Sequence, residues 1–253
     1  PVGEGPAREA PTPAPAVAPA VAVDEAGSPY ASLAGVEYVE VITGGARAGE
    51  ALPLVIAIHG LGDRPERFAG VLRGLRAPAR VILPRAFDAS GDGFSWFPVR
   101  ARSKDVEGLA AGIAAATERL GPFVAALPGA RPTIGRPIVT GFSQGGILSF
   151  ALAVRYPREV AAALPIAGWL PPPLWPSQRP TEATLPPITA FHGDADAVVR
   201  IEPTRAAVAH LQALGYPATL REHAGVAHEV PAAIRRELCE GIEAAIAAQE
   251  AAP

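Results

Sequence analysis

The chain has 253 residues, of which 49% are hydrophobic and 19% are charged, with a net charge of −3. This balance predicts one packed globular domain with a large core and argues against a disordered chain. It offers neither a basic excess for nucleic acid nor a Lys/Arg run for an anionic membrane surface. No apolar stretch reaches the roughly 18 residues that a membrane span needs, so we expect no transmembrane segment.

The first 29 residues differ in composition from the rest of the chain. Ala and Pro alternate there, as in Thr12-Pro13-Ala14-Pro15-Ala16, with no aromatic residue and no helical period. Such a segment buries too little apolar area to offset its chain entropy, so we expect a disordered tether at 1–29 and a folded domain at 30–253. The sequence contains no Met, and a processed N-terminus followed by a tether favours export. The alternative is a cytoplasmic protein cut at an arbitrary boundary.

From residue 36 onward, strand-like and helix-like segments alternate, which predicts an α/β domain with a mainly parallel sheet. Residues 36–42 alternate apolar and polar, as in a half-exposed edge strand. Residues 52–58 are continuously apolar, as a strand covered on both faces must be. Further short apolar runs predict strands at 81–83, 138–140, 161–167 and 188–191, and a last strand is expected near 218–222.

Helical patterns fill the gaps between these strands. Ser103 is a candidate N-cap for a helix with apolar residues at steps of three and four as far as Leu120. Three more helices are expected at 144–156, at 203–214 before Gly215, and after Pro231. Residues 171–187 are Pro-rich and without period, which predicts a long loop that flanks the mouth of the active site.

The only cysteine is Cys239, which rules out an internal disulfide and a thiolate metal cluster. It lies among apolar and charged residues at helical spacing, so we expect a buried structural thiol. No cluster of His, Asp and Glu at ligand spacing suggests a metal, and no phosphate loop or dinucleotide fingerprint suggests a cofactor.

A G-x-S-x-G motif, Gly141-Phe142-Ser143-Gln144-Gly145, lies between a predicted strand and a predicted helix. A sharp turn at this junction would hold Ser143 in a strained conformation, where larger side chains at the flanking glycines would collide with backbone. The turn would project the hydroxyl above the sheet edge at the positive end of the helix. The pentapeptide is weak evidence alone, and its strand-to-helix context favours a nucleophile over an ordinary glycine-rich turn.

A serine nucleophile needs an imidazole to take its proton and a carboxylate to fix the imidazole, in the chain order Ser, Asp, His. His192-Gly193-Asp194-Ala195-Asp196 follows a predicted strand, where catalytic groups of open α/β sheets gather. Asp196 is the preferred acid because it lies further out in the loop, whereas Asp194 is suited to bracing the turn.

His223 and His228 compete for the role of the base. His223 falls inside the last predicted strand, and His210 lies mid-helix among alanines as an expected surface residue. His228 lies in the loop before the final helix and is therefore the preferred base.

Stabilising the developing oxyanion requires two backbone N–H groups. One is expected from Gln144, which follows the nucleophile. The other is expected from Leu61 in the loop His59-Gly60-Leu61-Gly62-Asp63, whose glycines allow a tight turn.

With these residues placed, the chain from about Leu52 onward resembles the phospholipase/carboxylesterase family of α/β-hydrolases, which includes acyl-protein thioesterases and small bacterial carboxylesterases. The most specific element is Gly141-Phe142-Ser143-Gln144-Gly145-Gly146. The others are His59-Gly60-Leu61-Gly62-Asp63, Ser95-Trp96-Phe97, Trp169-Leu170-Pro171, and His192-Gly193-Asp194-Ala195-Asp196 with Val198-Val199. The resemblance implies an α/β-hydrolase fold, a triad of Ser143, Asp196 and His228, and oxyanion donors at Leu61 and Gln144. It also implies hydrolysis of short or medium acyl esters, lysophospholipids or thioesters.

The resemblance further places a group of loop side chains at an acyl-binding groove: Trp96, Phe97, Trp169, Leu174 and Trp175. They would form an apolar wall for a small acyl ester, although loop aromatics also serve simply to anchor loops to the core. The chain departs from the family in having Pro98 after Ser-Trp-Phe, where an acidic residue is usual, and in its proline-rich loop and tether.

Two alternatives remain at this stage: a serine peptidase of the same fold, and a non-catalytic binding protein that retains it. A peptidase would normally need a further domain or a charged pocket. The ordered set of Ser, Asp and His argues against a binding protein.

Overall fold

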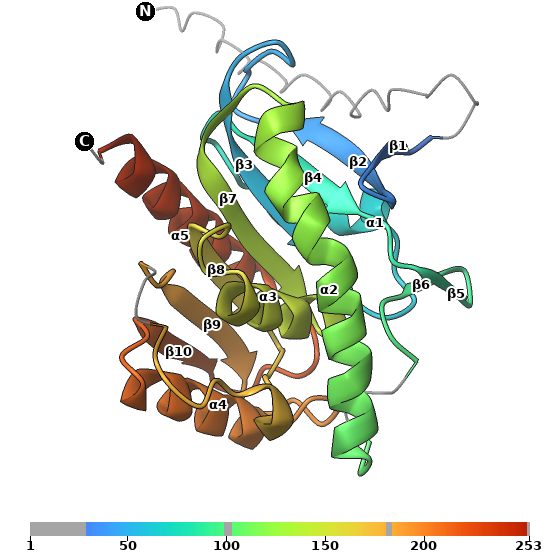
Figure 1. Ribbon diagram of the computed structural model, residues 1–253, viewed down its shortest axis with the longest axis vertical. Helices are drawn as coiled ribbons and strands as arrows, with labels where there is room; N and C mark the ends of the chain where they lie inside the picture. The colour runs from blue at the N-terminus through green and yellow to red at the C-terminus, as the bar shows by residue number, and fades with distance from the viewer. Residues whose placement is uncertain (1–28, 99–102, 181–183, 252–253) are drawn as a thin grey trace, which may run out of the picture.

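The computed structural model describes residues 29–98, 103–180 and 184–251, so that the predicted tether lies outside them except for Pro29. An eight-stranded sheet forms the centre of the molecule, in the order β1-β2-β4-β3-β7-β8-β9-β10 (Figure 1). Its strands are β1 Ala31–Leu33, β2 Val36–Ile42, β3 Leu52–Ile58, β4 Arg80–Pro84, β7 Thr133–Phe142, β8 Ala162–Ile166, β9 Ile188–Gly193 and β10 Ala218–His223. The α/β class predicted from the alternating pattern is confirmed.

The sheet is antiparallel at one end and parallel elsewhere. β1 pairs with β2 and β2 with β4 in antiparallel fashion, whereas β4, β3, β7, β8, β9 and β10 are parallel. The prediction that residues 36–42 form the edge strand is wrong for the first half of β2. The short strand β1 covers that half, with Ala31 opposite Tyr38 and Leu33 opposite Val36.

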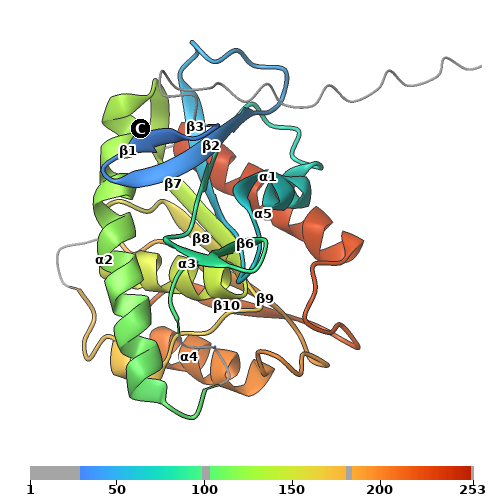
Figure 2. The same ribbon diagram turned by 90° about the vertical axis from the view of Figure 1, so that its right-hand side faces the viewer.

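Helices cover both faces of the sheet (Figure 2). The helices are α1 Pro65–Phe68, α2 Val106–Ala130, α3 Gln144–Arg155, α4 Ile201–Ala213 and α5 Ala232–Glu250, with short 3-10 helices η1 Ala69–Leu72 and η2 Pro172–Leu174. One core lies between the sheet and α2, α3 and α4, and a second lies between the sheet and α1, η1 and α5. Residues of β3 alternate between them: Ile56 faces the first core and Val55 the second. No helix of the described ranges is long and apolar enough to cross a membrane.

The start of α2 differs from the prediction. Asp105, not Ser103, is the N-cap, because its side chain accepts a hydrogen bond from the Gly108 N–H at 2.8 Å. Ser103 precedes this N-cap, and its hydroxyl oxygen accepts a hydrogen bond from the Asp105 N–H at 3.1 Å. The helix also continues ten residues beyond the predicted periodic segment that ended at Leu120.

Sequence patterns did not predict the small hairpin of β5 (Asp88–Ser90) and β6 (Gly93–Ser95). It lies beyond β4 and is joined to the loop after β3, since the Gly62 N–H donates to Phe94 O at 2.8 Å and the Phe94 N–H to Asp63 O at 3.0 Å. The hairpin therefore delivers the Ser95-Trp96-Phe97 segment to the carboxyl edge of the sheet.

Glycines allow α3 to approach the sheet backbone closely. A Cβ on Gly145 would overlap the carbonyl oxygen of Ile58 at the end of β3, and a Cβ on Gly146 would overlap that of Ile166 at the end of β8. Gly168 lies against Gly146 and has no room for a side chain either. The first turn of α3 is thus fixed between two strand ends.

Gly145→Ala should lower the free energy of unfolding by about 3 kcal/mol, because the added methyl cannot be accommodated without moving α3 or β3. The matched change Gly129→Ala, in α2, meets nothing within 4 Å and should raise stability by about 0.5–1 kcal/mol. Urea denaturation measures both. Equal effects of the two substitutions would contradict the close approach.

Candidate active site

Ser143 lies at the turn between β7 and α3, with φ 56° and ψ −116°. A non-glycine residue rarely adopts a positive φ, so this is the strained turn that the G-x-S-x-G motif predicts. Its N–H donates to Ile166 O at 3.0 Å, which anchors the turn to the end of β8. The residue is 8% exposed, so it is buried with only a small part of its surface open to solvent.

The structure brings Ser143, His228 and Asp196 together. His228 Nε2 lies 2.9 Å from Ser143 Oγ, and His228 Nδ1 lies 2.7 Å from Asp196 Oδ2. The second oxygen of Asp196 accepts from the N–H groups of Val198 at 2.9 Å and Val199 at 2.8 Å. The Asp196 side chain is fully buried, so its position is set by these hydrogen bonds and not by water.

This arrangement determines which nitrogen of His228 carries hydrogen. A carboxylate only accepts, so Nδ1–H donates to Asp196 and the lone pair of Nε2 faces the Ser143 hydroxyl. His228 can then take the serine proton, while Asp196 orients the ring and stabilises the charge that forms on it. The Phe142 ring, 4.6 Å from the imidazole, packs against it.

The competing residues have other contacts. Asp194 accepts from the Gly225 N–H at 2.6 Å and so braces its loop, as expected for an aspartate in a turn. His223 lies at the end of β10 with its Nε2 3.8 Å from Glu237. Within the described ranges neither residue contacts Ser143.

The loop after β3 lies beside the serine. A Cβ on Gly60 would be 3.4 Å from Ser143 Cβ, so the backbone just before Leu61 lies next to the serine. The N–H of Leu61 and that of Gln144, the first residue of α3, have no acceptor among the residues the structure describes. Both are therefore available to an oxygen bound next to Ser143.

The side chain of Gln144 has a role that the sequence did not suggest. Its Oε1 accepts from the Trp96 N–H at 3.0 Å, and its Nε2 donates to Phe97 O at 3.0 Å. Trp96 in turn donates its indole N–H to His59 O at 2.9 Å. These bonds join the segment after the hairpin to both the start of α3 and the loop that carries Leu61.

The side chains of Trp96 and Phe97 therefore lie in the core and not in the exposed acyl-binding wall that was predicted. They are only 2% and 1% exposed, and their side chains pack into the core that contains α2 and α3. One feature of the sequence could have indicated that Trp96 and Phe97 are buried. Gln144 is polar within an apolar motif, and a buried amide needs a hydrogen-bond partner for both its oxygen and its nitrogen.

His59 is a second buried support of the same loop. Its Nδ1 lies 2.7 Å from Gly60 O, and its Nε2 accepts from the Ala86 N–H at 3.3 Å. Burial lowers the pKa of His59, which favours the neutral ring that these two contacts require.

Leu174 and Trp175 of the predicted groove line a separate hollow of about 370 Å³, between α2, α3 and η2. Trp175 donates its indole N–H to Leu170 O at 2.7 Å and stacks on His210 at 4.5 Å. His210 also contacts Pro176 O at 2.9 Å, so it supports the proline-rich loop and is not the free surface residue that was expected. Trp169, the fifth predicted residue, is 9% exposed.

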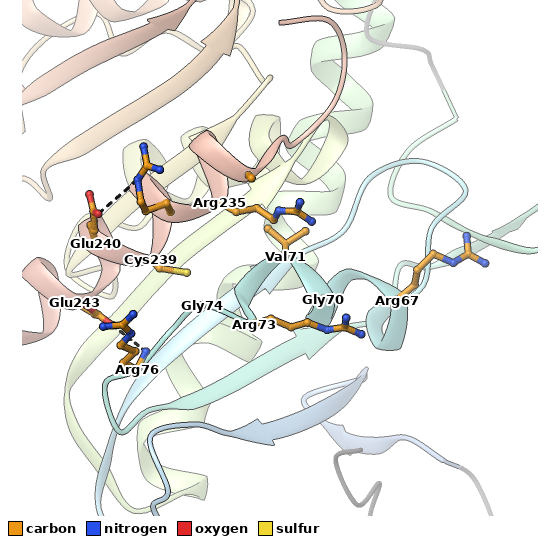
Figure 3. A pocket seen from close by; sticks show the side chains of 12 residues that line it. Arg67, Gly70, Val71, Arg73, Gly74, Arg76, Arg235, Cys239, Glu240 and Glu243 are labelled. Carbon is orange, nitrogen blue, oxygen red and sulfur yellow. Dashed lines mark hydrogen bonds and ion pairs between the residues drawn. The ribbon is translucent and has the colours of Figure 1, made fainter. Parts of the chain in front are cut away.

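Another hollow, of about 730 Å³, lies between η1 and α5 and contains none of the triad residues (Figure 3). Arginines such as Arg73 and Arg235 project around it, and Cys239 lies between the two helices. Cys239 is 4% exposed, which confirms that it is buried. Across the described ranges, no group of three or more His, Cys, Asp or Glu side chains is placed to hold a metal ion.

Comparison with known sequences finds several relatives of this chain. A probable carboxylesterase of Oryza sativa subsp. japonica is 36% identical over 93 residues, which cover 36% of this chain and 35% of that protein. Acyl-protein thioesterase 1 of Mycosarcoma maydis is 30% identical over 168 residues, or 57% of this chain and 69% of that protein. The alignments to the rice protein and to carboxylesterase SOBER1 of Arabidopsis thaliana thus span 35% and 41% of those relatives' lengths.

Solved structures share the fold over most of the chain. Esterase PE8 superposes with a TM-score of 0.69 and 24% identity, covering 80% of this chain and 98% of that one. SOBER1 of Arabidopsis thaliana gives a TM-score of 0.65 and 22% identity, covering 76% and 98%. The sequence model described as Phospholipase/Carboxylesterase matches residues 38–245, from β2 into α5. The chain belongs to the phospholipase/carboxylesterase family of α/β-hydrolases.

Proposed function

We propose that this protein is a serine carboxylesterase that hydrolyses short- to medium-chain acyl esters through an acyl-enzyme on Ser143. The observation that carries the proposal is the unbroken series of hydrogen bonds from Ser143 through His228 to Asp196. Relatives named carboxylesterase and acyl-protein thioesterase support an acyl-transfer reaction on this scaffold.

The reaction follows from the positions of these groups. Ser143 Oγ attacks the ester carbonyl carbon while His228 Nε2 takes the hydroxyl proton. The carbonyl oxygen becomes an oxyanion and accepts from the N–H groups of Leu61 and Gln144. His228 then protonates the departing alcohol, which leaves the acyl group on Ser143. Water attacks this ester with His228 again as base, and the carboxylic acid is released.

Exposed apolar residues near the triad favour an uncharged acyl group. Leu61 and Val198 are large hydrophobic residues that stay 44% and 45% exposed. Leu61 follows Gly60, on which an added Cβ would be 3.4 Å from Ser143 Cβ, and the Val198 N–H donates to Asp196, so both residues are close to the triad in the chain. Exposed apolar surface of this kind suits an acyl chain better than a charged peptide. Thioesters, whose acyl part is the same, are the second candidate substrates.

Ser143→Ala should lower kcat by about 10⁴-fold or more, because no other group supplies the nucleophile. Ser149→Ala is the matched control. Ser149 is a buried serine of α3 whose hydroxyl donates to Gly145 O within the helix, at 2.8 Å. It should keep wild-type kcat in a p-nitrophenyl ester assay. Residual activity of Ser143→Ala near the wild-type rate would place the nucleophile elsewhere.

Trp96→Phe should lower kcat by about fivefold to tenfold and leave KM nearly unchanged. It deletes the hydrogen bond to His59 O, worth about 1 kcal/mol, and loosens the loop that presents the Leu61 N–H to the transition state. Steady-state kinetics separate the two parameters. An unchanged kcat would reduce Trp96 to a core side chain without influence on the loop.

A series of p-nitrophenyl esters of increasing acyl length, compared with aminoacyl anilides, tests the substrate class. We expect the esters to turn over faster than the anilides, because the exposed residues near the triad, Leu61 and Val198, are apolar and because esters have the better leaving group. Faster turnover of the anilides would favour the peptidase alternative.

A further inference from the structure

A second histidine, His192, lies behind the acid of the triad. It is the first residue of the His-Gly-Asp-Ala-Asp motif, and its side chain is fully buried in β9. Its Nε2 lies 2.7 Å from Val199 O and 3.5 Å from Asp196 Oδ2. Its Nδ1 lies 3.0 Å from Thr204 Oγ1 in α4.

The partners of His192 define its tautomer. A carbonyl oxygen only accepts, so the hydrogen on Nε2 donates to Val199 O. Burial is the largest influence on the pKa of His192 and lowers it. The hydrogen bond to Val199 O and the charges of Asp196 and Glu202 oppose this shift, and the charge of His228 adds to it. Burial favours the neutral ring, whose one hydrogen lies on Nε2. The single hydrogen of the Thr204 hydroxyl then has two acceptors, Gly168 O at 2.8 Å and His192 Nδ1 at 3.0 Å, and donates to one of them at a time.

The peptide of Val199 connects His192 to the catalytic centre. Its N–H donates to Asp196 Oδ1 at 2.8 Å, while its carbonyl accepts from His192 Nε2. The His192 side chain therefore fixes the Val199 peptide, and this peptide fixes the carboxylate of Asp196. Without this side chain, the carbonyl of Val199 would be buried without its partner and the loop could turn, moving the N–H away from the carboxylate.

The Nδ1 side of the His192 ring is connected, through Thr204, to the turn that carries Ser143. The Thr204 hydroxyl also lies 2.8 Å from Gly168 O, and Gly168 packs directly on Gly146 in the first turn of α3. Buried polar contacts therefore run from the start of α3, through Gly168, Thr204 and His192, to the loop of Asp196.

We propose that His192 is a positioning residue for the hydrolysis proposed above, whose Nε2–H acts through the Val199 peptide to fix Asp196 toward His228. It does not touch the substrate. The proposal rests on the esterase function, and it predicts that losing this one hydrogen-bond donor harms the chemical step more than it harms the fold.

Two amide variants separate the two sides of the ring. In His192→Gln the amide nitrogen can occupy the place of Nε2 and still donate to Val199 O. In His192→Asn the shorter amide reaches only the place of Nδ1, next to Thr204. Both retain a polar side chain at the same buried position. Leu211→Ala, which deletes a buried side chain of α4 away from this network, is the control for loss of stability.

Kinetics on p-nitrophenyl butyrate and proton NMR of the His228 Nδ1–H provide independent readouts. We expect His192→Asn to lower kcat by about 10–100-fold with KM little changed, as is usual when an outer support of a reactive group is lost. Its Nδ1–H resonance should shift or broaden. His192→Gln should stay within about fivefold of wild-type kcat and keep the resonance, and Leu211→Ala should lose stability alone.

The proposal is overturned if the Asn and Gln variants have equal kcat, or if His192→Asn keeps wild-type kcat and the wild-type resonance while only its melting temperature falls. If the wild-type protein hydrolyses no ester, the esterase function fails. The NMR comparison still tests the positioning of Asp196, because it needs only the folded protein.

Discussion

The position of Ser143 depends on direct backbone contact between the start of α3 and the ends of β3 and β8. This contact exists only because glycines stand at the points of approach: Gly145 lies against the end of β3, and Gly146 lies against the end of β8 and against Gly168. The contact forces the sharp turn that gives Ser143 its positive φ. The strain at one residue is offset by the packing of the whole helix, whose residues from Gln144 to Ala153 are buried.

Around this turn, buried polar groups hold the two sides of the site. On one side, Trp96 and Gln144 fasten the hairpin segment to α3 and to the loop that presents Leu61. On the other side, backbone N–H groups and His192 hold the loop of Asp196. Each of these polar atoms has a partner, as burial requires, so the reacting groups are fixed before a substrate arrives. The side chain of His228 is 17% exposed, whereas that of Asp196 is fully buried.

The sequence predicted the parts of the fold that depend on local pattern. Continuous apolar runs located β3 and most parallel strands, since strands buried on both faces leave no polar alternation. Chain order and position at strand ends selected Ser143, Asp196 and His228, the set that the structure brings together. Their catalytic roles stay a proposal until tested by substitution.

The missed features depend on contacts between distant segments. β1 has only three residues and is a strand because β2 lies beside it. The burial of Trp96 follows from Gln144 and His59, 48 and 37 positions away, which no local pattern reveals. Likewise, His210 looked exposed on its helix because the loop that covers it lies 34 positions earlier. Export, inferred from residues 1–29, also stays a prediction, since the described residues begin at Pro29.

The proposed function requires that folding make the hydroxyl of Ser143 a nucleophile. Labelling the folded protein with a fluorophosphonate, followed by peptide mass spectrometry, is a direct test of this requirement. We expect one adduct per chain, on Ser143, and no adduct after unfolding in urea. No adduct in the folded protein, or an adduct on another serine, would contradict it.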